Sequence, residues 1–374
     1  MPPKVLVIFG TRPEAIKMVP LVHQLIKHGI PTEVCITAQH RGMLDSVMQF
    51  FDLTATYDLD LMLPNQSLNK LASRIFETLD TVLQQAQPDL VLVHGDTTTS
   101  VVAAWAAFHW GIKVGHVEAG LRTYNKQAPF PEELNRQITS KIADYHFAPT
   151  LLAKQQLLID GIAEQDILLT GNTVIDALQL GLQKLNTGYV STDLSMVKKL
   201  VDVTKKLILV TGHRRENFGE GFESVCAALK KIAEREDIQI IYPVHMNPNV
   251  QRPVQELLGT EPNIKLISPI DYPAFIYLMS KSYLILTDSG GVQEEAPSLG
   301  KPVLVFREIT ERPEAVEAGT AKIVGTSAER ILSEVYALLD DMQLYAKMKQ
   351  AENSYGDGQA TQRIVDFIIM TFSK

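Results

Sequence analysis

Short apolar runs alternate with longer amphipathic stretches along the chain, in two successive series. In the first series the apolar runs are 5–9, 33–37, 90–94, 113–117, 145–148 and 167–170, and the amphipathic stretches between them include 16–28, 68–86, 100–110 and 132–143. In the second series the apolar runs are 207–210, 238–244, 264–267, 283–286, 302–305 and 321–324. Strands buried on both faces and separated by helices predict parallel, doubly wound sheets.

Two such series predict an α/β protein with two Rossmann-like domains, residues 1–185 and 186–358, that face each other across a cleft. The polar stretch 186–206 interrupts the pattern and is the expected boundary. A last helix at 359–374 is expected to cross back onto the first domain. At 374 residues, 45% of them hydrophobic, the chain is long enough for two cores. Because ligands of open α/β sheets bind beyond the carboxyl ends of the strands, residues at those ends are the candidates for function.

Composition excludes several classes of partner. A net charge of −8 argues against a nucleic-acid binder, which would carry a basic face. The mean hydropathy is +0.02, and no apolar run is long enough to span a bilayer, so no membrane partner is expected. The start of the chain lacks a signal-peptide cleavage site, and Cys35 and Cys226 are isolated thiols, which predicts a cytoplasmic protein.

The segment 287–296, TDSGGVQEEA, follows an apolar run and opens a helix. The turn Ser289-Gly290-Gly291 leaves backbone N–H groups open to a phosphate at the positive end of that helix. Glu294 and Glu295 lie one turn further on, where a carboxylate could accept hydrogen bonds from ribose hydroxyls. The alternative is an ordinary helix cap with glycines that allow a tight turn.

Cations that could bind a phosphorylated molecule lie at other strand ends. The clusters are Arg12 with Lys17, His213-Arg214-Arg215, and Arg307 with Arg312. Arginine can donate two parallel hydrogen bonds to phosphate oxygens, and histidine can donate a proton. Exposed basic residues near a helix start remain the alternative for the first cluster. Neither a GxGxxG nor a GxxxxGK[ST] motif is present, so no nicotinamide cofactor is expected.

Three carboxylates follow strands of the first series. Asp96 and Glu118 end successive apolar runs, and Glu132 lies further along the same half of the chain. Singly, each could be a helix cap or a first-turn acid. The pairs His94-x-Asp96 and His116-x-Glu118 also allow a metal site, but no HExxH motif or third histidine cluster accompanies them, and no metal is expected.

Taken together, these segments resemble the non-hydrolysing, bacterial-type UDP-N-acetylglucosamine 2-epimerase family. The matching stretches are FGTRPEAIK (9–17), TAQHR (37–41), HGDTTT (94–99), GHVEAGLRT (115–123), FPEELNR (130–136), GNTVIDAL (171–178), TGHRRENFG (211–219), YPVHMNPNV (242–250), LTDSGGVQEEAPSLGKPVLV (286–305), TERPEAVEAGT (310–320) and YGDGQA (355–360). The resemblance covers essentially the whole chain. It implies the glycosyltransferase-B architecture and a cytoplasmic homodimer that interconverts UDP-GlcNAc and UDP-ManNAc without NAD or metal.

The resemblance also implies roles for individual residues. Asp96, Glu118 and Glu132 are the expected catalytic carboxylates, and His213 is expected to assist the departing UDP. The expected substrate-binding residues are Arg12, Lys17, Gln66, Arg136, Phe275, Ser289, Gly290, Gly291, Glu295 and Arg312. The reaction expected for the family breaks the anomeric C–O bond, passes through 2-acetamidoglucal and UDP, and adds UDP back after inversion at C2.

Bacterial members of the family can also bind a second UDP-GlcNAc as an allosteric activator. Gln39, His40, Arg41 and His245 match that site, whereas Gly42 departs from the longer polar residue of many relatives. Three other functions stay open: a hydrolysing epimerase that releases free ManNAc, a glycosyltransferase, and a sensor that binds UDP-GlcNAc without turnover. The pathway that uses the product is not indicated by the sequence.

Overall fold

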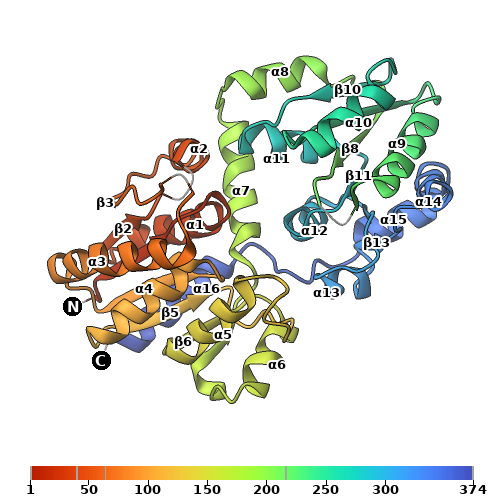
Figure 1. The fold of residues 1–374 in the computed structure, drawn as a ribbon. Helices are drawn as coiled ribbons and strands as arrows, with labels where there is room; N and C mark the ends of the chain where they lie inside the picture. The colour runs from red at the N-terminus through yellow and green to blue at the C-terminus, as the bar shows by residue number, and fades with distance from the viewer. Residues whose placement is uncertain (1, 39–40, 64, 215–216, 373–374) are drawn as a thin grey trace. The chain divides into compact units, whose positions relative to one another are not determined.

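The computed structural model describes residues 2–38, 41–63, 65–214 and 217–372 (Figure 1). They form two compact units: the first comprises Met1–Leu180 with Tyr355–Lys374, and the second comprises Gly181–Ser354. The sequence predicts divisions at 185/186 and 358/359, and the contacts between residues place them at 180/181 and 354/355. Residues 373–374 of the predicted last helix lie outside the described residues.

The first unit is built on a parallel sheet with the strand order β3-β2-β1-β4-β5-β6-β7. Its described strands are β1 (Val5–Phe9), β2 (Thr32–Ile36), β3 (Tyr57–Asp58), β4 (Leu90–His94), β5 (Lys113–Val117), β6 (Tyr145–Ala148) and β7 (Ile167–Leu169). Its helices are α1 (Arg12–Lys27), α2 (Arg41–Phe50), α3 (Leu68–Ala86), α4 (Thr98–His109), α5 (Glu132–Ile142), α6 (Leu151–Ile159), the first part of α7 (Thr173–Asn186) and α16 (Ala360–Phe372), with a short 3-10 helix at Glu164–Asp166.

The second unit is built on a parallel sheet with the order β10-β9-β8-β11-β12-β13. Its described strands are β8 (Lys206–Thr211), β9 (Ile238–Pro243), β10 (Ile264–Ile267), β11 (Leu284–Thr287), β12 (Val303–Val305) and β13 (Ala321–Ile323). Its helices are α8 (Thr192–Leu200), α9 (Glu220–Ile232), α10 (Pro248–Leu258), α11 (Tyr272–Lys281), α12 (Gly290–Glu295), α13 (Pro313–Glu317), α14 (Ala328–Asp340) and α15 (Met342–Gln350), with a 3-10 turn at Ala296–Leu299. The two parallel sheets confirm the predicted α/β class.

Polar caps and one glycine fix the start of α1 above the carboxyl end of β1. Thr11 and Glu14 form a reciprocal capping box, in which the Glu14 carboxylate accepts the Thr11 N–H at 2.8 Å. A Cβ on Gly10 would lie 2.1 Å from Thr37 Oγ1, so the chain can pass here only without a side chain. The first turn of α1 is therefore held close to the sheet edge.

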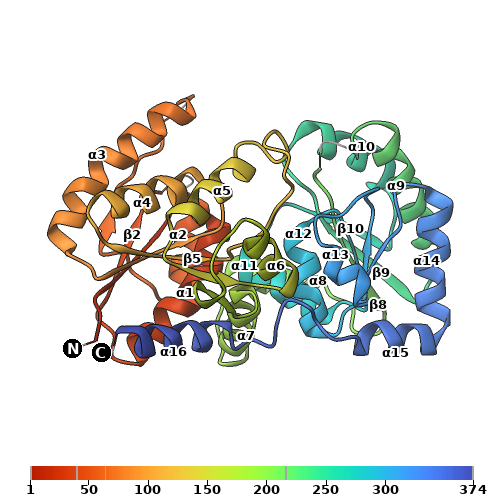
Figure 2. The ribbon, with the colours of Figure 1, turned by 90° about the horizontal axis from the view of Figure 1, so that it is seen from below.

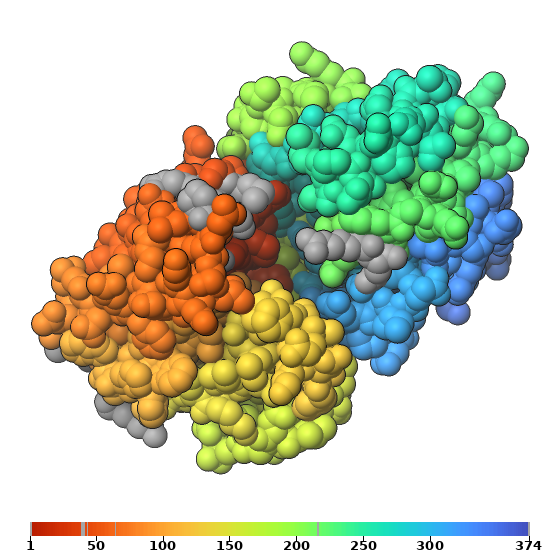
Figure 3. Space-filling model, viewed as in Figure 1, coloured from red at the N-terminus to blue at the C-terminus, as the bar shows by residue number. Residues whose placement is uncertain are grey.

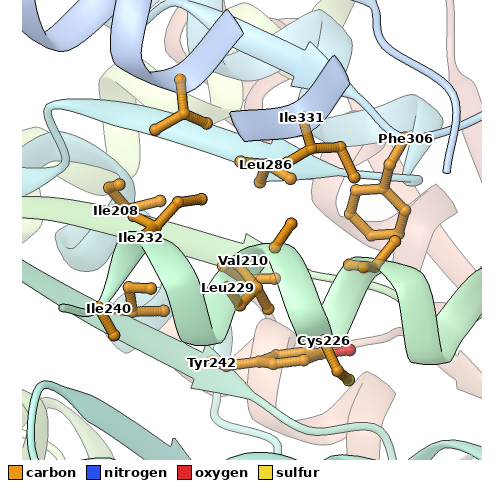
Figure 4. Packing of buried hydrophobic residues seen from close by; sticks show 14 of the residues in the cluster. Ile208, Val210, Cys226, Leu229, Ile232, Ile240, Tyr242, Leu286, Phe306 and Ile331 are labelled. Carbon is orange, nitrogen blue, oxygen red and sulfur yellow. The ribbon is translucent and has the colours of Figure 1, made fainter. Parts of the chain in front are cut away.

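The core of the second unit covers one face of its sheet with the apolar side chains of α9. Ile208, Val210 and Leu286 pack against Leu229 of α9, and the ring of Tyr242 closes one side (Figure 4). These side chains are almost fully buried. Burial of this kind stabilises the sheet by about 25 cal/mol for each Å² of apolar surface removed from water.

Apart from one-residue shifts at several strand ends, two segments differ from the sequence prediction. β3 is only two residues long, and a two-residue strand leaves no periodic pattern to detect. The polar stretch 186–206, which the sequence predicts to contain the boundary, includes a helix, α8, which starts at a Ser191 cap and buries Leu194 and Val197. The lysines and serines of this stretch hid the helical pattern, because α8 buries only a narrow apolar stripe.

The last helix, α16, packs along α1 in the first unit (Figure 2). Figure 3 shows the outer surface of α3 and α4 in orange. Helix α4 exposes 45% of Trp105 and 61% of Phe108. Among the described helices, none combines the length and apolarity needed to cross a membrane.

Candidate active site

In each unit the strand order reverses beside one central strand. In the first unit β1 lies between β2 and β4, and in the second unit β8 lies between β9 and β11. Ligands of doubly wound sheets bind at such reversals, beyond the carboxyl ends of the strands. The predicted residues Arg12, Asp96 and Glu118 follow β1, β4 and β5, and His213 and Ser289 follow β8 and β11.

Glu118 directly follows β5 and has a left-handed backbone, with a φ of +61°. This conformation is uncommon for a residue with a side chain and costs roughly 1–3 kcal/mol. The Glu118 carboxylate forms an ion pair with Lys17 of α1 and accepts a 2.8 Å hydrogen bond from Asn172 Nδ2. His94 Nε2 lies 3.7 Å from the same oxygen. Burial opposes ionisation, but Lys17 and His94 outweigh it and hold the pKa of Glu118 well below its usual range.

Asp96 shares this edge of the sheet but carries the opposite pKa shift. Burial raises the pKa of its carboxyl, and the negative charges of Glu118 and Glu132 raise it further. Arg136 opposes them, with its Nη2 2.8 Å from Asp96 Oδ2, but does not cancel the rise. One carboxyl is thus held ionised while its neighbour takes up a proton more readily, which is how acid and base roles are separated in many active sites.

Glu132 begins α5 and is half buried at the helix start. The next residue, Glu133, is fully buried and holds the preceding loop, since it accepts the N–H groups of Thr123 and Tyr124 at 3.0 Å each. Arg136 Nη1 lies 3.5 Å from Glu133 Oε2. Arg136, expected to bind substrate, therefore also ties Asp96 to the start of α5.

The geometry at His116 does not match the metal alternative of the His116-x-Glu118 pair. His116 is fully buried with Nε2 2.7 Å from the Gly95 carbonyl oxygen, and burial lowers its pKa to about 3. The left-handed turn at Glu118 breaks the strand geometry that would place it beside His116. Within 2–38, 41–63, 65–214 and 217–372, no three His, Cys, Asp or Glu side chains form a group that could hold a metal ion.

The other candidates of the first unit lie at the same edge or on a loop. Arg12 is the first residue of α1 and is half buried. Gln66 precedes α3, and its Oε1 accepts a 3.4 Å hydrogen bond from Arg74. Gln39 and His40 lie outside the described residues, and Arg41 begins α2.

In the second unit a buried carboxylate organises the loop after β8. Asp288 Oδ2 accepts the backbone N–H groups of His213 and Arg214 at 2.8 Å each. His213 Nδ1 lies 3.4 Å from Asp288 Oδ1, and the His213 ring stacks on His245 with 5.5 Å between ring centroids. Burial lowers the pKa of His213, Asp288 raises it, and Arg214 and His245 lower it, so the net shift is downward.

The Ser-Gly-Gly segment forms the start of α12 as predicted. Ser289 precedes the helix, and its N–H donates to Thr287 Oγ1 at 2.9 Å, so this N–H is already used. A Cβ on Gly290 would lie 3.7 Å from the Arg312 guanidinium group. Arg312 is itself paired with the buried Glu294. The structure thus brings Gly290 and Arg312 together at the edge of the second sheet.

Two further candidates for binding the nucleoside are engaged within the second unit. Glu295 Oε2 accepts a 3.0 Å hydrogen bond from the Tyr272 hydroxyl group. Phe275 lies in the first turn of α11, and its N–H donates to the Asp271 carbonyl at 3.0 Å. Any contact of Phe275 with uracil would therefore use another atom.

Sequence reasoning missed Asn172, Glu133 and Asp288, which position the candidate residues. Asn172 and Glu118, which are in contact, are 54 positions apart in the sequence, and Asp288 and His213 are 75 positions apart. No local spacing could reveal such pairs. The only sequence signal was their place within the matching stretches GNTVIDAL, FPEELNR and TDSGG.

Comparison with known proteins identifies the family of the chain. A family model described as UDP-N-acetylglucosamine 2-epimerase matches residues 23–369. The UDP-N-acetylglucosamine 2-epimerase of Escherichia coli (strain K12) is 54% identical over 366 residues, which are 97% of each chain. A crystal structure of UDP-GlcNAc 2-epimerase from Neisseria meningitidis bound to UDP-GlcNAc has a TM-score of 0.90 and 49% identity, over 98% of this chain and 100% of that one. A Methanocaldococcus jannaschii UDP-GlcNAc 2-epimerase in complex with UDP-GlcNAc and UDP has a TM-score of 0.79 and 33% identity, over 98% of this chain and 99% of that one.

These likenesses extend over nearly the whole chain and agree in name, sequence and fold. The protein is an enzyme of the isomerase class, and the chain belongs to the UDP-N-acetylglucosamine 2-epimerase family.

Proposed function

We propose that the protein interconverts UDP-GlcNAc and UDP-ManNAc by the non-hydrolysing route and so supplies ManNAc precursors for cell-surface polysaccharide. The observation that carries the proposal is the pair Asp96 and Glu118, two carboxyls at one sheet edge whose pKa values are shifted in opposite directions. The sugar ring uses the carboxylates of the first unit, and uridine diphosphate uses the second.

The chemistry requires anionic and proton-transferring groups together. The C2 proton of the sugar is not next to a carbonyl group, so its direct removal is slow. Cleavage of the anomeric C–O bond, with the electron pair leaving on UDP, gives the ring oxocarbenium character and acidifies that proton. Its loss forms the C1–C2 double bond of 2-acetamidoglucal. Protonation of C2 on the opposite face and return of UDP to C1 complete the inversion.

The pKa shifts suggest how the carboxyls divide this work. Glu118 stays ionised beside Lys17, so it suits electrostatic stabilisation of the cationic ring. Asp96, with its raised pKa, is closer to the range in which a group can both take and give a proton. Glu132 supplies a third carboxylate near Asp96, so that both faces of C2 can be served.

Groups of the second unit suit the leaving diphosphate. His213 and Arg312 supply a proton donor and a cation, and Gly290 and Gly291 leave backbone accessible beside the Arg312 guanidinium group. In the first unit, Arg12 and Lys17 of α1 would bind the sugar or its phosphates. Charge on a departing diphosphate is stabilised most when such donors are fixed before reaction.

Product analysis tests the proposal. The purified protein is incubated with UDP-GlcNAc without added NAD, and the mixture is separated by anion-exchange chromatography. A mixture of UDP-GlcNAc and UDP-ManNAc, reached from either sugar nucleotide, supports it. Free ManNAc accumulating together with equal UDP would instead identify a hydrolysing epimerase.

Allosteric activation by a second UDP-GlcNAc is part of the proposal. His245 lies against His213, so a ligand that contacts His245 could alter the ring that assists UDP. Kinetics with UDP-ManNAc should then be sigmoidal and become hyperbolic when UDP-GlcNAc is added. Hyperbolic kinetics that added UDP-GlcNAc leaves unchanged would argue against a second site.

A further inference from the structure

The buried carboxyl group of Asp288 has hydrogen bonds on one oxygen only. Its Oδ2 accepts the backbone N–H groups of His213 and Arg214 and, at 3.4 Å, the Asn217 side chain. Its Oδ1 receives no hydrogen bond from any of the residues that the structure describes. Since the Asp288 side chain has no solvent exposure, bulk water does not supply the missing donor. A buried carboxylate oxygen without a donor is unfavourable, so a nearby N–H group should turn toward it.

The His213 imidazole is placed to supply that N–H group. Its Nδ1 lies 3.4 Å from Asp288 Oδ1, and stacking on His245 at an interplanar angle of 19° restrains the ring. A neutral imidazole carries its proton on one nitrogen only. A proton on Nδ1 would satisfy Oδ1, whereas a lone pair there would face the carboxylate and be repelled. The side chain remains 43% exposed, so the imidazole stays accessible to a ligand.

We propose that Asp288 is a positioning residue, which holds the Nδ1–H group of His213 and turns Nε2 toward the diphosphate of the substrate, to which Nε2 donates once the imidazole has taken up a second proton. This inference rests on the proposed role of His213 in the departure of UDP. When Nε2 carries a proton for the leaving group, the carboxylate of Asp288 also stabilises the imidazolium against the like charge of Arg214. Asp288 acts through His213 and does not touch the reacting atoms.

The substitution Asp288→Asn separates this role from support of the loop. The amide oxygen of asparagine can still accept the N–H groups of His213 and Arg214. Its NH₂ group would then face Nδ1 and require a lone pair there, which favours the Nε2–H tautomer. The variant should therefore keep the loop and change the tautomer.

The first test measures the tautomer by ¹⁵N NMR of the histidine side chains, with His213 assigned by its loss in a His213→Gln variant. The wild-type protein should show the Nδ1–H form and Asp288→Asn the Nε2–H form. Asn217→Ala is the matched control, because it removes another hydrogen bond to the same carboxylate without touching the imidazole, and it should keep the wild-type tautomer. An Nε2–H form in the wild-type protein would overturn the inference, even if Asp288→Asn did not fold. So would an unchanged tautomer in folded Asp288→Asn.

The second test is a double-mutant comparison of epimerisation. Asp288→Asn should lower kcat by roughly 10²-fold or more while the Kd for UDP changes by less than about threefold. In a His213→Gln background the same substitution should cause no further loss, because the two residues act as a unit. A full additional loss in that background would show that Asp288 acts through the loop and would overturn the inference. A wild-type kcat in His213→Gln alone would count against the proposed role of His213 in catalysis. The NMR measurement would still show whether Asp288 fixes the tautomer of His213.

Discussion

Asp96 and Glu118 lie at one sheet edge, yet their surroundings shift their pKa values in opposite directions. Lys17 and Asn172 contact the Glu118 carboxylate directly, and their contacts favour its charged form. Asp96 has Arg136 as its cation but also experiences the negative charges of Glu118 and Glu132. At the residue scale, the arrangement keeps Glu118 charged, and the charge of Glu118 makes ionisation of Asp96 less favourable.

Replacing Asp96 should therefore affect activity and stability in opposite directions. Asp96→Asn removes a proton-transfer group, so kcat should fall by roughly 10²–10⁴-fold. A raised carboxyl pKa means that the folded protein disfavours the charge, and this cost is fully present at neutral pH. The variant should thus melt at or above the wild-type temperature at pH 7, as calorimetry would show. Near-normal turnover would remove Asp96 from the catalytic groups.

Lys17→Met should leave the buried Glu118 carboxylate without its cation and lower the free energy of unfolding by about 3 kcal/mol. Because the folded-state pKa of Glu118 is lowered, the pair stabilises the protein above the ordinary carboxyl pKa of about 4.3 and loses this effect as the pH falls through the lowered value. The difference from wild type should accordingly shrink on acidification, which urea unfolding at several pH values would measure.

Lys113→Met is the matched control for this measurement. Lys113 pairs with Asp144 at 2.6 Å, but its side chain is 55% exposed. Such a surface pair contributes about 0–1 kcal/mol. Equal losses in the two lysine variants would contradict the assignment of Lys17 as the partner that keeps Glu118 ionised.

At the element scale, the sequence pattern predicted many strands well because most of their residues are apolar and buried, with exceptions such as Lys113 and His116 of β5. Strands β1, β4, β5, β6 and β10 begin and end at the predicted residues. The pattern could not reveal which of the polar residues are buried and position others. Glu133 is one example, because the sequence does not distinguish it from its neighbour Glu132. In the structure Glu133 is fully buried and accepts hydrogen bonds from the backbone of the preceding loop. Helix α8 was missed because polar residues outnumber its two buried apolar ones.

The docking of α16 depends on one buried carboxylate. Asp176 of α7 accepts the Ala360 N–H at 3.3 Å, the Thr361 N–H at 2.9 Å and the Thr361 hydroxyl group at 2.7 Å. It therefore caps the start of α16 from a distant part of the chain. Asp176→Ala should lower the free energy of unfolding by about 2 kcal/mol, since it leaves these donors unpaired.

Hydrogen exchange tests the same substitution at the level of the helix. Amide protection in α16 should fall by on the order of 10-fold in Asp176→Ala, because the helix opens locally more often. Asp366→Ala changes an exposed carboxylate on α16 itself and should leave this protection near the wild-type value. If α16 exchanged at the wild-type rate in Asp176→Ala, its other contacts, such as the hydrogen bond from Arg363 to the Thr170 carbonyl, would be sufficient to hold the helix.

At the scale of the whole molecule, the two series of apolar runs led to the prediction of two Rossmann-like sheets, and the structure contains both. Arg12, Asp96, His213 and Ser289 follow strands at the reversal of their sheet, whereas Glu118 follows β5, one strand further along. The sequence motifs identified the candidate residues, but the hydrogen bonds and ion pairs among these residues became visible only in the folded structure. The family relationship covers both units, since its model matches residues 23–369.

In the proposed reaction a proton is removed from C2 of the sugar and replaced while the sugar and UDP stay in the site. Incubation of the protein with UDP-GlcNAc in deuterated water, without NAD, tests this exchange. Mass spectrometry and NMR should find deuterium at C2 of both UDP-GlcNAc and UDP-ManNAc, with no accumulation of free sugar. Formation of UDP-ManNAc with hydrogen retained at C2 would contradict the account.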